Sequence, residues 1–356
     1  MYKIGIIGTS WAAKSPIPTF KSYKGVEVTA ICSGNIKNAI TCAKQFNIPN
    51  VEKDYLSLCA RKDLDIIYIG SPVHMHSKMF LEAAKANKHI ICEKPLALNA
   101  KEGQVMLNAV KKYKITSIAA YTMRHFASHQ LMKKLISQGK IGKPIHLSIN
   151  DFRGIPASKT LPSYRWWFQK NKGGGILGAM GSHFIDLTRF MVDDFDSVYG
   201  TLGSINKQAI DKKNVIKKIT SDDIFSLNGQ LKSNTSVSIN CSISTNTKLG
   251  SNRSIAMYGN EGTLTLEGDE ISPNGAKLLF SSNKSSSNKE IKIPSIKMSA
   301  SARKSTVPRF GLMIDKLIAG INGAKQSPDI LDGLKCQKVI DAVHLSNKSG
   351  ITVKIK

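Results

Sequence analysis

Short apolar runs alternate with helix-like segments through the first 120 residues of this 356-residue chain. Isoleucine-rich runs bounded by turn residues predict strands, and apolar residues at three- and four-residue spacing predict helices between them. The strands are expected at 3–8, 26–32, 64–70, 89–92 and 115–120, and the helices at 36–47, 54–62, 75–87 and 101–113. This alternation predicts a parallel sheet with helices on both faces. Because Pro16 and Pro18 fall in the first expected helix, that helix must start late or bend.

The pattern changes after about residue 122. Helices are expected at 128–138 and 176–192, followed by several strand-like runs with period-two alternation. Such alternation is typical of an antiparallel sheet with one buried face. We therefore expect an α/β protein of two domains, the first at 1–122 and the second at 123–356. The second is predicted to be an α+β domain with a large, mostly antiparallel sheet.

The formal charge of +26 raises the question of an anionic partner. The lysines are spread over the whole length, and only eight of the 51 basic residues are arginine, the residue that base edges and phosphate forks favour. We therefore expect no nucleic-acid partner, and an anionic small-molecule substrate is compatible with the charge. Since no apolar run approaches the ~18 residues that span a bilayer, no membrane association is expected.

Six cysteines occur at positions 32, 42, 59, 92, 241 and 336. They form no C-x-x-C pair and no spacing typical of a metal site. Several lie in apolar runs, where a free thiol behaves as a small hydrophobic group. The pattern favours a reducing, cytoplasmic compartment, and we predict no metal.

The turn after the first expected strand has the sequence Gly8-Thr9-Ser10-Trp11-Ala12-Ala13. In a dinucleotide fingerprint, G-x-G-x-x-G/A, the pyrophosphate lies on the N–H groups that begin the helix. Gly8 and Ala13 occupy the first and third places, whereas Ser10 replaces the second glycine. Taken alone, the turn is equally compatible with a tight strand–helix connection. As a fingerprint, it predicts a Rossmann domain that binds NAD or NADP.

The second expected strand ends in Cys32-Ser33-Gly34-Asn35, without the acidic residue that usually binds the ribose hydroxyls of NAD. No carboxylate would therefore repel a 2′-phosphate, and Ser33, Asn35 and Lys37 offer groups that can bind one. The segment slightly favours NADP over NAD.

Several longer motifs follow in order. They are GSPVHMH at 70–76, CEKPLA at 92–97, Met123-Arg124, GGGILGAMGSHFID at 173–186 and YGNEGTL at 258–264. In their order and spacing they resemble the glucose–fructose oxidoreductase and inositol dehydrogenase family, nearly end to end. The resemblance implies an NAD(P)-dependent oxidoreductase acting on a sugar, polyol or related carbohydrate derivative. It also implies a cis proline in the E-K-P motif, which would aim the lysine into the cleft.

We expect the dinucleotide to be bound by residues from the strand ends of the first domain and from the start of the second. They are Gly8, Thr9, Ser10, Trp11, Ser33, Asn35, Ser71, Pro72, His76, Glu93, Lys94 and Arg124.

Three glycines at 173–175 precede an expected helix that carries His183 and Asp186. Met180, Phe184, Leu187 and Met191 make an apolar face for the core. His183 and Asp186 are three residues apart and can reach one cleft; a core histidine paired with Asp186 is the alternative. In the family this helix faces the nicotinamide at the domain interface, which would exclude bulky side chains there.

Oxidation of a secondary alcohol requires hydride transfer and removal of the hydroxyl proton. A lysine can hydrogen-bond the alcohol oxygen, and a histidine, with an unperturbed pKa of ~6.5, can exchange the proton. We therefore predict Lys94 and His183 as catalytic residues. The expected substrate-binding residues are Lys94, Trp166, His183 and Asp186, although Trp166 is equally suited to interface packing.

One position departs from the family pattern. Polyol dehydrogenases of the family usually have Asp four residues before the histidine, and this chain has Ala179. This loss puts inositol-type chemistry in doubt and leaves a non-catalytic NAD(P)-binding regulator as the alternative. Family members generally form dimers or tetramers through the open face of the C-terminal sheet, so a homodimer or homotetramer is expected.

Overall fold

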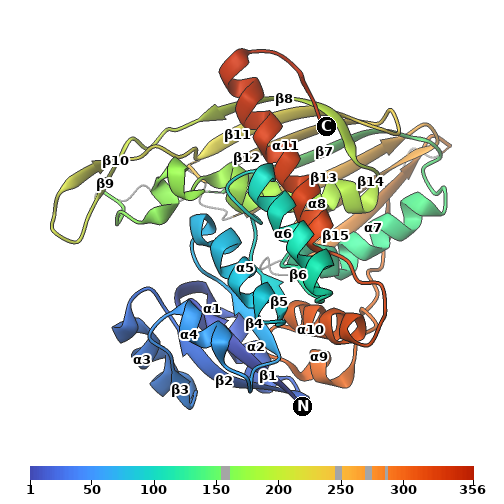
Figure 1. Ribbon diagram of the computed structural model, residues 1–356. Coiled ribbons are helices and arrows are strands. Elements are labelled where there is room, and N and C mark those ends of the chain that lie inside the picture. Colours follow the sequence, from blue (N-terminus) through green and yellow to red (C-terminus); the bar gives the residue numbers. More distant parts are fainter. Residues whose placement is uncertain (154–160, 245–250, 269–274, 285–287) are drawn as a thin grey trace. The chain divides into compact units, whose positions relative to one another are not determined.

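A computed structural model of the protein describes residues 1–153, 161–244, 251–268, 275–284 and 288–356 (Figure 1). The chain divides into two compact units. Unit 1 comprises Met1–Thr122 together with Lys297–Gln337, and unit 2 comprises Met123–Ile296 together with Lys338–Lys356.

Unit 1 contains a six-stranded sheet in the order β3-β2-β1-β4-β5-β6, with every pair parallel. The strands are β1 Tyr2–Ile7, β2 Val26–Cys32, β3 Asn50–Val51, β4 Ile66–Ile69, β5 His89–Cys92 and β6 Ser117–Ala119. This order confirms the predicted parallel sheet. It also places a topological switch point between β1 and β4, where open α/β sheets bind ligands. The two-residue strand β3 is too short to show a period in the sequence.

Helices connect these strands. They are α1 Ser10–Lys14, α2 Pro16–Ser22, α3 Ile36–Phe46, α4 Tyr55–Ala60, α5 His76–Lys85 and α6 Ala100–Tyr113. The helix is interrupted at Ser15, and Pro16 is the first residue of α2. A backbone N–H at that position would have no partner within the helix, so proline is tolerated there. The prolines were expected to delay or bend the first helix, and the structure shows a break between two short helices rather than a late start.

The segment 297–337 packs in unit 1, although the sequence analysis placed it in the second domain. It forms α9 Ala300–Lys304, α10 Pro308–Ile321 and the beginning of α11 Ile330–Ser349. Phe310, Met313 and Leu317 of α10 are buried in the same hydrophobic cluster as Ile4 of β1. The spacing of these residues predicts an amphipathic helix, but spacing does not reveal which core the helix covers.

Unit 2 is built on a nine-stranded sheet in the order β16-β15-β14-β13-β7-β12-β11-β8-β17. The strands are β7 Pro144–Arg153, β8 Phe195–Gly203, β11 Ile224–Leu231, β12 Ser236–Ser242, β13 Ser251–Gly259, β14 Gly262–Gly268, β15 Ala276–Ser282, β16 Lys289–Ile291 and β17 Val353–Lys354. β7 and β12 are parallel, and the other neighbours are antiparallel. The predicted mostly antiparallel sheet is confirmed, and a hairpin of β9 Gln208–Ile210 and β10 Ile216–Lys218 is additional.

One face of this sheet packs against helices. Gly181, which precedes α8 (Ser182–Met191), lies against Phe225 of β11, and Val343 of α11 lies against Gly200 of β8. The helix α7 (Ala127–Ser137) packs against α8 and β15. Along β12, Val237, Ile239 and Cys241 are buried toward the helices, whereas the alternating Ser236, Ser238 and Asn240 are polar and half-buried.

The opposite face of the sheet is lined by hydroxyl, amide and imidazole groups. His146 of β7 contacts the hydroxyls of Ser236 and Ser238 through its two ring nitrogens, at 2.7 and 3.0 Å. Asn240 donates to the side-chain oxygen of Asn150 on the neighbouring strand at 3.1 Å. Among the described residues, no helix has the length and apolar character that crossing a membrane requires.

Candidate active site

The carboxyl end of β1 lies directly against the end of β4. Gly8 has a φ of +101°, and a Cβ atom there would lie 2.5 Å from the carbonyl oxygen of Gly70. Only glycine fits this close approach. No side chain caps the first N–H groups of α1, which begins two residues later. Uncapped N–H groups of this kind can bind phosphate oxygens, so the turn fits a dinucleotide at the position where the fingerprint predicts one.

A buried carboxylate joins this turn to the end of β5. Oε1 of Glu93 accepts hydrogen bonds from Nε1 of Trp11 at 3.0 Å and from the hydroxyl of Tyr68 at 2.8 Å. Burial raises the pKa of Glu93. Trp11 and Glu93, both predicted to bind the dinucleotide, therefore interact with each other, and Glu93 fixes the indole beside the fingerprint turn.

Lys94 follows immediately at the carboxyl edge of the sheet. Its side chain is half-buried, and the Lys94–Pro95 peptide bond is cis, as the family resemblance implied. The backbone N–H of Lys94 donates to Oε2 of Glu93 at 3.4 Å. The buried side chain of Glu93 therefore holds the backbone of Lys94, the predicted catalytic lysine.

His76 connects two of the strand-end loops. Its Nε2 lies 2.9 Å from the carbonyl oxygen of Ser71, and its Nδ1 lies 3.1 Å from that of Pro95. The ring is buried, and this burial lowers the pKa of His76. His76 is therefore placed to hold Ser71 and Pro72 beside the E-K-P loop. Direct contact of its imidazole with a cofactor stays a prediction.

The end of β2 carries the residues predicted to distinguish NADP from NAD. The side-chain oxygen of Asn35 accepts a hydrogen bond from the backbone N–H of Lys37 at 3.0 Å and so caps α3. Ser33 is half-buried one residue after the strand. Asn35 is exposed and has a local role as an N-cap. Contact of Ser33 or Asn35 with a cofactor stays a prediction.

In unit 2, the three glycines before the histidine helix each have a local reason. Gly173 and Gly175 have φ values of +76° and +114°, which side chains rarely adopt. A Cβ at Gly174 would lie 2.0 Å from the carbonyl oxygen of Trp167, and one at Gly175 would lie 2.1 Å from Oδ1 of Asp222. Close packing within unit 2 is therefore sufficient to require this glycine run.

The segment after these glycines is a π-helix, η5 Leu177–Gly181, that continues into α8. The N–H of Ser182 donates to the carbonyl of Leu177, five residues earlier. Single π-turns are frequent at functional sites. His183 is the second residue of α8 and is 7% exposed. The predicted apolar face is buried at Phe184, Leu187 and Met191, and Met180 is half-buried.

Asp186 is engaged by an arginine. Nε and one terminal nitrogen of Arg124 donate to Oδ2 and Oδ1 of Asp186 at 2.7 and 2.6 Å. Both side chains are buried. Arg124 was predicted to bind the cofactor and Asp186 the substrate, and in the structure the two side chains form one bidentate pair. Such a pair anchors the start of unit 2 to the histidine helix.

Trp166 lies in a short 3₁₀ segment, Trp166–Phe168, in which no residue is fully buried. The rings of Trp166 and Trp167 are 6.3 Å apart and edge-on. The Arg165 guanidinium lies 5.8 Å from the Trp167 ring centre. Trp166 itself is half-buried, and its contact with a substrate stays a prediction.

Lys94 belongs to unit 1 and His183 to unit 2. Their convergence on one nicotinamide therefore also stays a prediction. Within unit 1, Glu93 accepts a hydrogen bond from the backbone of Lys94. Within unit 2, Asp222 accepts one from the backbone of Leu177, at the start of the helix that carries His183.

Sequence reasoning missed Asp222. It precedes β11 and is 9% exposed, and its Oδ2 accepts the backbone N–H of Leu177 at 2.7 Å. A signal was present: two adjacent acidic residues, Asp222 and Asp223, stand directly before a strand in a strongly basic chain.

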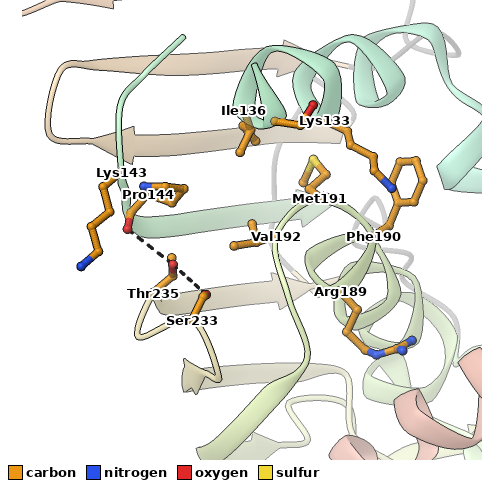
Figure 2. Close-up of a pocket in the computed structure, with 11 residues that line it drawn as sticks. Lys133, Ile136, Lys143, Pro144, Arg189, Phe190, Met191, Val192, Ser233 and Thr235 are labelled. Carbon is orange, nitrogen blue, oxygen red and sulfur yellow. Dashed lines mark hydrogen bonds between the residues drawn. The ribbon is translucent and has the colours of Figure 1, made fainter. Parts of the chain in front are cut away.

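Unit 2 also has a surface pocket of about 590 Å³ between the end of α7, the start of β7 and the end of α8 (Figure 2). Two of the cations that line it, Arg189 and Lys133, interact with other groups. Arg189 donates to Asp194 at 2.7 Å, and the ammonium of Lys133 lies 3.9 Å from the Phe190 ring centre. Figure 2 shows Lys143 and Arg189 pointing in different directions. The pocket offers no convergent set of groups for one ligand.

Within the described ranges, no group of three or more histidine, cysteine, aspartate or glutamate side chains is placed to hold a metal ion. All six cysteines are buried thiols.

The parallel sheet, its switch point and the glycine turn after β1 are the features of a dinucleotide-binding fold. Two sequence models of one family match the chain. The first, described as an oxidoreductase family with an NAD-binding Rossmann fold, matches residues 2–121, and the second, the GFO/IDH/MocA C-terminal domain, matches residues 129–265. The protein belongs to the Gfo/Idh/MocA family of NAD(P)-dependent oxidoreductases.

Among its relatives is levoglucosan dehydrogenase of Pseudarthrobacter phenanthrenivorans, 34% identical over 175 residues, which are 49% of this chain and 45% of that enzyme. Glucose-6-phosphate 3-dehydrogenase of Bacillus subtilis is 24% identical over 67% of each chain. A solved structure of levoglucosan dehydrogenase with NADH and L-sorbose aligns with a TM-score of 0.87 at 22% identity, covering 100% of this chain and 99% of the other. The chain thus matches about half the length of its 34%-identical relative in sequence and shares the whole fold.

Proposed function

We propose that the protein transfers a hydride between NAD(P) and a hydroxyl or keto carbon of a sugar, polyol or related carbohydrate derivative. The observation that carries this proposal is the position of Lys94. It follows β5 at the carboxyl edge of the parallel sheet, beside Glu93, which is itself bonded to Trp11 of the fingerprint turn. A lysine at this edge stands where dinucleotides bind in open α/β sheets. The named substrates of the relatives, levoglucosan and glucose 6-phosphate, support a carbohydrate.

In the oxidation direction, the C–H bond of the alcohol breaks and the hydroxyl loses its proton as the carbonyl forms. A dinucleotide bound at the fingerprint turn would supply the acceptor for the hydride, which leaves with both electrons of the C–H bond. The ammonium of Lys94 donates a hydrogen bond to the alcohol oxygen and stabilises its developing negative charge. The imidazole of His183 takes the hydroxyl proton and returns it in the reverse reaction.

For the cofactor, we propose NADP with NAD as the weaker alternative. This preference is supported by Ser33 and Asn35, because the segment that directly follows β2 in the sequence contains no carboxylate to repel a 2′-phosphate. Lys37 adds a cation in the first turn of α3.

We also propose a homodimer or homotetramer formed through the polar face of the nine-stranded sheet. The row of hydroxyl and amide groups around His146 and Asn240 supplies hydrogen-bonding groups for a second copy. A cytoplasmic location is supported by the six buried thiols, which suit a reducing compartment.

The test is a turnover assay of the purified protein with NAD(H) or NADP(H) and a panel of sugars, sugar phosphates and polyols. We expect reduced cofactor to appear or disappear with at least one carbohydrate. Cofactor binding by calorimetry without turnover on any compound would instead support the non-catalytic regulator that Ala179 leaves as the alternative.

A further inference from the structure

The four residues that precede β11, 220–223, form hydrogen bonds with several segments of unit 2 that are distant in sequence. The N–H of Thr220 donates to the carbonyl oxygen of Phe168 at 3.0 Å, and the hydroxyl of Ser221 donates to the carbonyl oxygen of Trp167 at 3.0 Å. Asp222 binds the start of the π-helix η5, and Asp223 binds the chain at 205–206. The aromatic segment and the histidine helix are therefore tied to the same short stretch.

Asp222 contacts the helix start through both its backbone and its side chain. The N–H of Ile176 donates to its carbonyl at 3.1 Å, and the N–H of Leu177 donates to its Oδ2 at 2.7 Å. These N–H groups belong to the first turn, where helix donors have no partner within the helix. Asp222 caps the helix from a distance of 45 residues in sequence, whereas most helix caps come from the adjoining residue.

The glycine turn has room for the carboxylate of Asp222 because Gly175 has no side chain. A Cβ at Gly175 would lie 2.1 Å from Oδ1 of Asp222 and 2.8 Å from its Cγ. The chain therefore gives up a side chain at Gly175 and tolerates a φ of +114° there. A bare backbone is what allows Asp222 to reach the N–H of Leu177.

The carboxylate of Asp222 is buried, and burial disfavours its charged form. Burial, with a smaller contribution from the negative charge of Asp223, raises the pKa of Asp222 to about 6, against the opposing effect of the Leu177 and Ile176 N–H groups. At neutral pH Asp222 is still mostly ionised, and the positive end of the helix favours that charge. Buried carboxylates with raised pKa values concentrate at functional sites.

We propose that Asp222 is a positioning residue of the active site, holding the η5–α8 helix so that His183 is presented to the substrate. The inference rests on the proposed function in one respect, because it takes His183 as the proton-transferring group. It also gives this chain a carboxylate that supports the histidine helix, where related polyol dehydrogenases have Asp at the place of Ala179.

Asp223 provides a matched control. It is the next residue, it is also buried, and its carboxylate accepts the N–H groups of Ile205 and Asn206 at 2.7 and 2.8 Å. Its side chain therefore has a comparable structural role on a loop that does not carry His183.

The kinetic experiment compares Asp222→Asn, Asp222→Ala and Asp223→Ala with the wild type and in a His183→Ala background. Asn retains an acceptor for Leu177, so we expect kcat to fall about threefold in Asp222→Asn and about 30-fold in Asp222→Ala, with KM for the cofactor unchanged. In the His183→Ala background, Asp222→Ala should lower kcat less than twofold, because nothing is left to position. An equal factor in both backgrounds, or an equal loss in Asp223→Ala, would overturn the proposal.

Hydrogen exchange supplies a second readout that requires no substrate. Peptides covering residues 176–182 should exchange at least tenfold faster in Asp222→Ala and at the wild-type rate in Asp223→Ala. Unchanged exchange in Asp222→Ala would contradict the proposal that Asp222 stabilises the start of the η5–α8 helix. If exchange changes as expected but His183→Ala retains full turnover, the proposed role of His183 fails and Asp222 remains the cap of that helix.

Discussion

Arg124 and Asp186 form a bidentate ion pair in unit 2, with nitrogen–oxygen distances of 2.7 and 2.6 Å and side chains that are 6% and 1% exposed. The pair joins the 3₁₀ segment Thr122–His125 to α8 one turn after His183. Two parallel hydrogen bonds fix both the distance and the rotation of the groups they join.

Breaking this pair on one side should destabilise the protein strongly. Asp186→Asn leaves the Arg124 guanidinium buried with its counter-charge removed, and we expect the free energy of unfolding to fall by about 3–5 kcal/mol. Urea unfolding at pH 7.5 measures the change. Lys85→Ala, which removes an exposed partner of Glu82, is the control and should cause no measurable loss. Equal stability of the two variants would show that the buried pair does not anchor α8.

Removing the ammonium at the edge of the parallel sheet should abolish most turnover. We expect Lys94→Ala to lower kcat by about 10²- to 10⁴-fold, because the alcohol oxygen loses its charged donor. Initial rates on the best substrate of the carbohydrate panel measure this loss. Lys85→Ala, on an exposed face of α5, should keep the wild-type rate. A Lys94→Ala enzyme with normal kcat would remove Lys94 from the mechanism.

A carboxylate at the end of β2 should change the cofactor preference. We expect Ser33→Asp to weaken NADP binding about tenfold or more and to leave NAD binding unchanged or improved, because the new charge repels the 2′-phosphate. Dissociation constants for both cofactors, taken by fluorescence titration, measure the ratio. Asn38→Asp adds the same charge on an exposed position of α3 and should leave the ratio near that of the wild type.

The stability of the protein should depend on pH through Asp222. Because its pKa is raised from 3.8 to about 6 in the folded state, the stability due to the protonated carboxyl is present below about pH 4 and is lost as pH rises through 6. Asp223 and the buried thiol of Cys241 are the other titratable groups that interact with it. Asp222→Asn should therefore gain up to about 3 kcal/mol over the wild type between pH 4 and 8. Parallel stability curves for the two proteins would contradict the raised pKa.

The glycine run should be intolerant even of alanine. In Gly174→Ala the new methyl group meets the carbonyl oxygen of Trp167 at 2.0 Å, so the backbone must move, and we expect a loss of about 2–4 kcal/mol. Gly34→Ala is the matched control, since no atom lies within 4 Å of its Cβ position and its φ is ordinary. Thermal unfolding of both variants tests the contrast, and similar melting temperatures would mean that the turn is not tightly packed.

The parallel sheet was predictable because five of its six strands are short apolar runs that alternate with amphipathic helices. The break between α1 and α2 was predictable because Pro16 cannot lie inside a helix. Strand β3 and the β9–β10 hairpin have two or three residues per strand and no detectable period. The placement of α10 in unit 1 depends on which surface its apolar face meets, and local sequence does not carry that information.

At the site, the motifs identified the loops but not the partners of their side chains. Glu93, His76 and Asp186 were predicted to meet ligands, and the structure gives each of them protein partners. Asp222 was missed because its partner, Leu177, is distant in sequence and contributes only a backbone N–H group.

The return of α10 to unit 1 has a consequence for synthesis of the protein. Phe310 and Leu317 complete a core that begins with Ile4, so the sheet of unit 1 stays partly uncovered until the ribosome has translated these two residues, about 300 codons after Ile4. A gene fragment ending after codon 122 would encode all six parallel strands and still lack the helix that shields them. Nascent chains of this protein therefore depend on late residues, or on chaperones, to keep their earliest strands from aggregating.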